Sequence, residues 1–273
     1  MRQPSESTPR SVVEKLNLHR VNCAPANLRK RYLDSLPHSQ EYFLEQLVNT
    51  GDFFEILGSS GGPEGYIVVS ASHIVEVFLE SPSEQLLNQA ISEVVGALNI
   101  KKMYIKSFDP MIAYLSSNLM IDSKIDGYLF RQHLNVNFDK KLDLLVSNLD
   151  SSETAEIMAM NDGFFEDETE VKNYIDNDAL FAYRNRAGVL IACGILSRVI
   201  EGRSAVDIGM LVDAKHRNHG FGGYVANHLK NLCQERGDQP IAGCSAENIS
   251  SKKALEATGF VSEHQLLELN LCQ

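Results

Sequence analysis

Apolar positions along the chain recur with two spacings, which predict an alternation of strands and helices. Short apolar or alternating runs between Gly, Pro, Asn and Asp are typical of strands, whereas apolar residues at i, i+3, i+4 and i+7 are typical of helices with one buried face. In the first half the predicted strands are Leu16–Val21, Phe53–Leu57, Tyr66–Ser70, Ile74–Leu79, Met103–Phe108 and Tyr128–Phe130. The predicted helices of this half are two short ones on either side of Pro37, one from Ser81 to about Leu98, and one over Pro110–Leu119.

The second half repeats this order of elements. Its predicted strands are Leu142–Val146, Leu180–Arg184, Val189–Ile200, Val206–Val212, Pro240–Ala246 and Leu267–Leu271. Its predicted helices are Ser152–Phe164, Glu168–Ile175, a helix from Phe221 that stops at Gly237, and Ser250–Ala257. We therefore predict an α/β fold, a mixed twisted sheet with flanking helices, built as two tandem units. Because the apolar pattern lapses over residues 134–140, the predicted division is a flexible lead-in over 1–14, a first domain over 15–138 and a second over 139–273.

A glycine-rich helix start follows the strand Val206–Val212. Gly220, Gly222 and Gly223 stand at the mouth of the helix, where unpaired backbone N–H groups and the helix dipole favour a phosphate. A dinucleotide fingerprint does not fit, because residue 225 is Val and seven residues separate strand from helix. A P-loop lacks its Gly-Lys-Ser/Thr sequence here. The remaining alternative is a glycine-rich helix start that only packs closely on a neighbour.

Two motifs in this half resemble those of the GNAT acetyltransferase superfamily. The run Arg217-Asn218-His219-Gly220-Phe221-Gly222 resembles the acyl-CoA-binding signature Arg/Gln-x-x-Gly-x-Gly/Ala. The run Asn248-Ile249-Ser250-Ser251, followed by Gly259-Phe260, resembles a later motif of the same superfamily. The resemblance in motifs covers about residues 142–271, and in the first half the element order resembles the family.

The resemblance implies acetyl-CoA as co-substrate. The backbone of the glycine turn would hold the pyrophosphate, and pantetheine would lie in a splay between Val206–Val212 and Pro240–Ala246, with a strand N–H donating to the thioester carbonyl. The residues it implies for binding acetyl-CoA are Leu211, Val212, Arg217, Asn218, His219, Gly220, Phe221, Gly222, Gly223, Asn248 and Ser251.

Candidate catalytic groups are fewer. Asp207 lies on the strand before the glycine turn, where family members often place a carboxylate base; alternatively it pairs with Arg198 or Arg203 or faces solvent. Glu247 is a second candidate base. Leu255 stands where many members have a Tyr that protonates the leaving thiolate, so water or a Ser such as Ser251 would have to supply this proton. Cys244 is expected to be a packing residue rather than a nucleophile.

The acceptor is less defined by the sequence than the donor. The family selects its acceptor through its first two helices, and residues 162–170 are apolar and then strongly acidic. They indicate a cationic amine or peptide acceptor, or merely an acidic helix N-terminus that the dipole favours. In the first half, Ser81-Pro82-Ser83-Glu84 predicts a capping box with Pro at the first helical position. Because such a cap occupies the free N–H groups, we expect the first half to bind no CoA.

Composition and charge narrow the possible partners. Hydrophobic residues make up 44% of the chain and charged residues 22%, as in a globular protein, and no apolar run is long enough to span a membrane. The net charge is −11, and residues 139–273 hold 13 Lys and Arg against 21 Asp and Glu, so nucleic acid and anionic membranes are disfavoured. The five cysteines have no C-x-x-C spacing, so we expect neither disulfides nor a metal. The start lacks the apolar stretch of a signal peptide, and we expect a cytoplasmic protein.

The sequence thus predicts an N-acetyltransferase that moves an acetyl group from acetyl-CoA to a primary amine. A non-catalytic CoA-binding or structural protein with the same fold is the alternative, and a nucleotide-binding enzyme is a third class. The acceptor, the physiological acyl group and the oligomeric state stay open.

Overall fold

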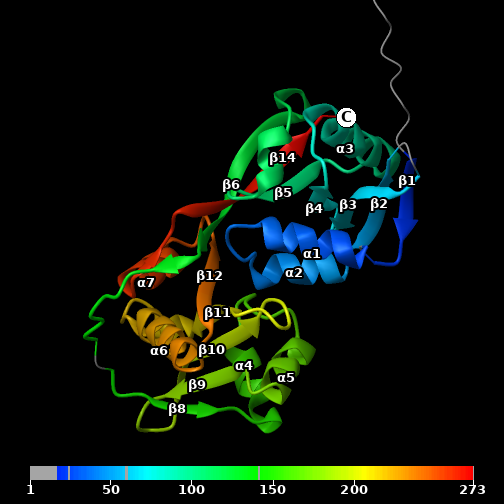
Figure 1. Cartoon of the computed structure of the whole chain (residues 1–273). Coiled ribbons are helices and arrows are strands. Elements are labelled where there is room, and N and C mark those ends of the chain that lie inside the picture. Colours follow the sequence, from blue (N-terminus) through cyan, green and yellow to red (C-terminus); the bar gives the residue numbers. More distant parts are fainter. Residues whose placement is uncertain (1–16, 24, 59–60, 141, 273) are drawn as a thin grey trace, which may run out of the picture.

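A mixed sheet runs through the whole molecule (Figure 1). The computed structural model describes residues 17–23, 25–58, 61–140 and 142–272. Within them, twelve strands pair in the order β1-β2-β3-β4-β5-β14-β6-β12-β11-β10-β9-β8, and β13 pairs with β7 in a separate sheet. The predicted α/β class is confirmed. The predicted lead-in over residues 1–14 lies outside the described residues.

The elements of the first half agree with the predicted order. Its strands are β1 (Asn17–Val21), β2 (Asp52–Leu57), β3 (Pro63–Ser70), β4 (His73–Leu79), β5 (Lys102–Lys106), β6 (Met120–Phe130) and β7 (Gln132–His133). Its α-helices are α1 (Ala26–Ser35), α2 (Tyr42–Asn49) and α3 (Glu84–Leu98), joined by the 3-10 helices η1 (Pro110–Tyr114) and η2 (Ser117–Leu119).

The second half follows the same plan. Its strands are β8 (Leu145–Asn148), β9 (Leu180–Arg184), β10 (Leu190–Arg198), β11 (Ala205–Val212), β12 (Gln239–Ser245), β13 (Phe260–Val261) and β14 (His264–Leu271). Its helices are η3 (Ser151–Glu153), α4 (Thr154–Met160), α5 (Glu168–Asp176), η4 (Ala214–His216), α6 (Phe221–Glu235) and α7 (Ile249–Ala257).

The two halves exchange their last strands. The C-terminal strand β14 lies between β5 and β6 of the first half, and β6 pairs with β12 of the second half through Phe130↔Ala242 to Gly127↔Ser245. Leu269 and Leu271 of β14 accordingly pack in the core of the first half, whereas Phe130 packs in the core around α6. The sheet of each unit is therefore completed by a strand from the other unit. The division between residues 138 and 139 stays a prediction.

Helices cover both faces of the second half's sheet. Val206 and Ile208 of β11 pack with Val225 of α6, while Leu211 packs with Val171 of α5 on the opposite face. Side chains alternate along a strand. The odd-numbered positions of β11 therefore face α4 and α5, and the even-numbered positions face α6.

Two predicted helices of the first half differ from the structure. The segment 110–119 forms two 3-10 helices rather than one α-helix, because the chain becomes extended at Leu115 after the turn that Asp109 caps through Met111 N–H. Helix α3 begins at Glu84 with Ser83 as its cap, whose hydroxyl accepts from Leu86 N–H at 3.2 Å. The predicted capping box from Ser81 to Glu84 was therefore wrong by two residues, although a side chain does cap this helix.

Two further boundaries were misplaced. Strand β6 begins at Met120, whereas the prediction began it at Tyr128. The prediction missed residues 121–125 because they are exposed on both faces and carry little apolar pattern. The predicted helix 152–164 ends at Met160, since Asn161 Oδ1 accepts from the N–H groups of Phe164 and Phe165 and turns the chain. Among the helices of the described ranges, none has the length and apolar character needed to cross a bilayer.

Candidate functional site

The N-terminus of α6 is open, as the glycine pattern predicted. Gly220 precedes the helix in the left-handed conformation, with φ of 84°, and no side chain caps the first turn. Asn218 also has a positive φ, of 65°. The first N–H groups of α6 are therefore free to meet an anion. The corresponding turn of α3 differs, because Ser83 occupies one of these groups there.

A pocket of about 720 Å³ lies at this helix end. Ten of the predicted acetyl-CoA-binding residues line it: Leu211, Val212, Arg217, Asn218, Gly220, Phe221, Gly222, Gly223, Asn248 and Ser251. His219 does not line the pocket; its side chain is exposed, with Nδ1 3.2 Å from the carbonyl of His216. The two sequence motifs thus meet at one pocket. A role for His219 stays a prediction.

Polar contacts hold the rim of the pocket in place. The Arg217 guanidinium donates through Nε to Val212 O at 3.1 Å and pairs with the carboxylate of Asp162. Asn248 caps α7, since its Oδ1 accepts from Ser251 N–H at 3.0 Å. Arg217 and Asn248 therefore shape the turns around the pocket as well as lining it.

The segment between the halves contributes two residues that the sequence analysis missed. Phe138 and Lys140 line the pocket. A Cβ added at Gly223 would lie 3.2 Å from the Phe138 ring, and one added at Gly220 would lie 1.9 Å from Lys140 Nζ. The ammonium of Lys140 therefore sits directly over the glycine turn. Nothing in the sequence pattern distinguishes these residues from an ordinary connecting segment.

Strands β11 and β12 separate beside the pocket. Their parallel pairing runs from Ala205↔Gln239 to Asp207↔Ile241, although both strands continue, to Val212 and Ser245. This is the splay that the family resemblance implied for pantetheine. Asp207 stands at its vertex.

The carboxylate of Asp207 is held from the first half. Its Oδ2 accepts from Tyr42 N–H at 2.9 Å. Burial raises the pKa of Asp207 to about 6, against the opposing effects of Arg131 and the Tyr42 N–H. Arg198 and Arg203, the alternative partners considered from the sequence, pair instead with Asp238 and Asp34.

Asp207 shares one face of β11 with the acceptor-side segment. Gly209, the next residue on that face, is covered by Phe164, whose Cζ would lie 3.0 Å from a Cβ at Gly209. Phe164 also lines the pocket. Asp207 itself does not line the pocket; it stands one alternate residue, about 7 Å, further along β11 than Gly209.

A second carboxylate at the vertex was not found from the sequence. Glu41 is 7% exposed, and a Cβ added at Gly243 of β12 would lie 2.3 Å from Glu41 Oε2. Burial raises the pKa of Glu41 to about 7, with Asp207 adding to the increase and Arg131 opposing it. Glu41 belongs to the first half, just before α2, so no motif near the glycine turn could reveal it.

The other chemical candidates lie elsewhere. Glu247 is exposed beyond the end of β12 and does not line the pocket. Leu255 is 2% exposed and packs in the core around α6, so it can supply no proton. Burial raises the pKa of the Cys244 thiol to about 11, which keeps it neutral. No group of three or more His, Cys, Asp or Glu side chains converges within the described ranges.

Comparison with known proteins agrees with this architecture. Residues 24–133 match the family model described as acetyltransferase (GNAT) domain, and residues 198–267 match the one described as FR47-like protein. In the first half, only the order of elements resembled the family in the sequence analysis. A family model thus matches this half at the sequence level as well. No match was found among curated proteins.

Solved structures show the same fold. A GNAT-family acetyltransferase from Colwellia psychrerythraea has a TM-score of 0.80 at 18% identity, over 94% of this chain and all of that one. A tandem GNAT protein from the clavulanic acid biosynthesis pathway has a TM-score of 0.55 at 10% identity, over 94% of this chain and 98% of that one. A fungal multi-domain GH3 β-N-acetylglucosaminidase, which contains a GCN5-related glucosamine N-acetyltransferase region, has a TM-score of 0.59 at 14% identity, over 93% of this chain and 38% of that one.

The fold is that of an α/β protein built from two units, with an open helix N-terminus at a pocket in the second unit. The chain belongs to the GNAT superfamily. This membership supports acyl-CoA-dependent acetyl transfer as the general class of its activity.

Proposed function

We propose that the chain transfers an acetyl group from acetyl-CoA to a primary amine at the splay between β11 and β12. The observation that carries this proposal is the uncapped N-terminus of α6, which opens into the 720 Å³ pocket beside the splay. Phosphates of the donor would meet the N–H groups of Gly220 to Gly223, with Arg217 and Lys140 adding positive charge nearby. The pocket and the free N–H groups at the start of α6 support an acetyl-CoA site at this position.

The reaction requires a neutral amine next to a polarised thioester carbonyl. Backbone N–H groups of β11 that no longer pair with β12 are placed to donate to this carbonyl. Asp207, at the vertex, attracts the ammonium form of the acceptor and takes one of its protons. The amine nitrogen then bonds to the carbonyl carbon, the carbon–sulfur bond breaks, and the second amine proton leaves with the thiolate as the free thiol. The protons are all accounted for without a tyrosine as general acid, so Leu255 at that position is compatible with the reaction.

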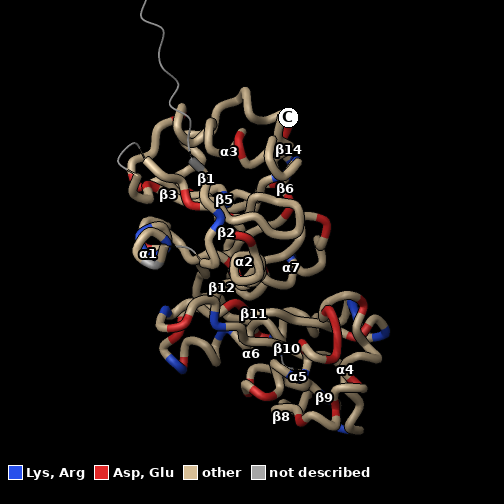
Figure 2. Tube along the Cα trace, turned by 90° about the vertical axis from the view of Figure 1, so that its right-hand side faces the viewer, with Lys and Arg blue, Asp and Glu red and all other residues tan. Residues whose placement is uncertain are grey.

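A cationic acceptor is part of the proposal. Asp and Glu positions, red in Figure 2, flank α4 and α5, and Glu166, Asp167 and Glu168 are exposed. Asp167 also caps α5 by accepting from Thr169 and Glu170 N–H, so part of this charge has a structural use. Glu168 also pairs with Lys172 Nζ at 3.4 Å, so of these three carboxylates Glu166 is the one left to draw a cationic amine toward Phe164 and the vertex.

The test of this function is thiol release from acetyl-CoA in the presence of an amine panel. The panel holds spermidine, lysine, a peptide with a free N-terminus and glucosamine. We expect release that depends on the amine and an acetylated product of the matching mass. Acetyl-CoA binding without release for any amine would contradict catalysis and favour the second candidate, a non-catalytic CoA-binding protein, to which the absence of a Tyr at Leu255 points.

A further inference from the structure

A short segment of the first half reaches the vertex of the splay between β11 and β12 in the second. Residues 39–41 end the connection between α1 and α2, and Tyr42 is the first residue of α2. The Ser39 carbonyl accepts from Arg131 Nε at 2.6 Å, and Tyr42 N–H donates to Asp207 at 2.9 Å. Arg131 Nη1 in turn donates to Ala242 O of β12 at 2.8 Å. The segment is thus fastened to both strands that form the splay.

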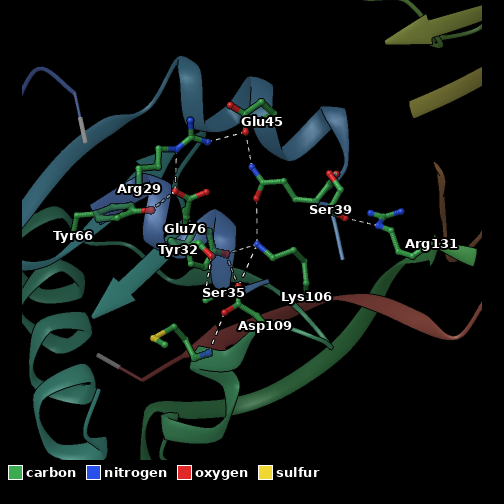
Figure 3. A network of polar contacts seen from close by, with 12 residues as sticks. Arg29, Tyr32, Ser35, Ser39, Glu45, Tyr66, Glu76, Lys106, Asp109 and Arg131 are labelled. Atoms are coloured by element: carbon green, nitrogen blue, oxygen red, sulfur yellow. Dashed lines mark hydrogen bonds and ion pairs between the residues drawn. The ribbon is translucent and has the colours of Figure 1, made fainter. Parts of the chain in front are cut away.

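A buried polar network in the first half also fixes the position of this segment. Gln40 Nε2 donates to Glu45 Oε2 at 2.5 Å, and Lys106 Nζ donates to Gln40 Oε1 at 3.4 Å. Figure 3 shows the network continuing from Glu45 through Arg29 to Glu76, and from Lys106 to Tyr32 and Asp109. This network lies in the first half, so the core of that half fixes the position of residues 39–42.

Glu41 is the charged side chain that this segment places at the vertex, near Gly243 and Asp207. It is the cap position of α2, yet its carboxylate does not cap the helix. It lies instead against Gly243, where any Cβ would collide with Oε2. Its charged neighbour is Arg131, with 4.0 Å between Oε2 and Nη2, and this Nη2 is buried without a hydrogen-bond partner among the described residues. A buried carboxylate with so little compensation is costly unless it has a use.

We propose that Glu41 and Asp207, one from each half, act as a single base that takes the proton of the acceptor amine. The inference rests on the proposed function and deepens it: the first half supplies a catalytic residue rather than only support. One proton moves from the ammonium nitrogen to the carboxylate pair, the nitrogen's free electron pair bonds to the acetyl carbon, and the thiolate carries off the second proton. The pair returns its proton to solvent after the product leaves.

The charged and titratable groups around Glu41 come from several elements. They are Arg131 after β6, Asp207 on β11, Lys106 and Tyr104 on β5, Asp126 on β6 and Cys244 on β12. Asp207 and Asp126 raise the pKa of Glu41, and Arg131 and Lys106 lower it. Burial holds the pKa of both carboxylates above their ordinary values, at about 6 for Asp207 and about 7 for Glu41.

The test compares the acceptor pH profile of the full-length wild type with those of Glu41→Gln, Asp207→Asn and Glu41→Asp, using the fastest amine of the panel. Glu41→Gln is expected to lower kcat/KM for the amine about 100-fold, in the range found for loss of general-base catalysis, with acetyl-CoA affinity within about twofold of wild type. The acidic limb of the profile should move to lower pH, because it then reports Asp207 alone, whose pKa of about 6 lies below the value of about 7 at Glu41. Glu41→Asp should restore part of the rate. Glu263→Gln, which removes an exposed charge, is the matched control and should change neither.

Three results separate the possibilities. A Glu41→Gln variant that is slower than wild type, and whose acidic limb lies at lower pH, supports the pair of Glu41 and Asp207. A Glu41→Gln variant that keeps the wild-type rate and limb, while Asp207→Asn loses activity, overturns the pair and leaves the proposed function standing. A wild type that binds acetyl-CoA but acetylates no amine overturns both. Circular dichroism of each variant checks the fold, and a Glu41→Gln variant that does not fold is replaced by Glu41→Asp, for which an unchanged limb and rate would count against the pair.

Discussion

At the scale of single residues, most of the pocket lining could be predicted from the sequence, and the groups around Asp207 could not. Gly220, Gly222 and Asn248 were found because glycines and caps act locally, on the few backbone groups that follow them in the sequence. Glu41 escaped because its role depends on a fold that brings residue 41 next to residue 207. No spacing in a single sequence carries that information. The base proposed from the sequence, Asp207, was therefore only half of the proposed pair.

The raised pKa of Glu41 predicts how stability depends on pH. The folded state holds this proton more tightly than the unfolded chain, since the pKa rises from 4.5 to about 7. The stabilising effect of the proton is therefore complete below pH 4.5 and is lost as the pH rises through 7. Between pH 5 and pH 8 the wild type should lose on the order of 2 kcal/mol more of its free energy of unfolding than Glu41→Gln. Urea denaturation at the two pH values measures this, and parallel losses in both proteins would contradict it.

At the scale of elements, most helices and strands followed from their apolar spacing. The errors fell where a polar side chain or a distant strand determines the end of an element. Ser83 rather than Ser81 caps α3, and Asn161 ends the helix before Phe164. Strand β6 extends over residues that are exposed on both faces. The sequence predicts the domain division within the connecting segment 134–140. This segment also forms a wall of the pocket, through Phe138 and Lys140.

The connecting segment gives a prediction for acetyl-CoA affinity. Lys140 Nζ lies over the glycine turn, where phosphates of the donor would lie. Lys140→Gln should raise the Kd of acetyl-CoA about fivefold to tenfold at low salt and less at high salt, because a screened charge loses its effect. Isothermal titration at two salt concentrations measures the change. Lys101→Gln removes an exposed lysine of the first half and serves as control; equal effects of both variants would rule out a local role for Lys140.

At the scale of the whole molecule, strand exchange joins the two units. Duplication was visible as a repeated order of elements, but the insertion of β14 between β5 and β6 was not. Strand pairing between segments more than 100 residues apart leaves no local pattern. The consequence is that each half completes the sheet of the other, and that the vertex of the cleft contains groups from both.

Separating the halves tests this dependence. Residues 139–273 alone would lack β6 and leave β12 with an unpaired edge, while β14 would have lost both of its neighbours. We expect this fragment to aggregate or to show no cooperative unfolding, and co-expression with residues 1–138 to restore a soluble complex. Size-exclusion chromatography and thermal unfolding measure both. A soluble isolated fragment with wild-type affinity for acetyl-CoA would show the exchange to be dispensable.

The most direct measurement is a calorimetric titration of acetyl-CoA into the wild type, Gly222→Ala and Gly96→Ala. A Cβ at Gly222 meets the protein only at ordinary contact distances, of which the shortest is 3.5 Å, yet Gly222 lines the pocket. Gly96, in α3, has open space around it and serves as the matched helix glycine. We predict about one acetyl-CoA per chain for the wild type and Gly96→Ala, and a Kd raised about tenfold or more in Gly222→Ala without loss of thermal stability. Binding of two acetyl-CoA molecules, of none, or equally well to Gly222→Ala would contradict a single donor site at the start of α6.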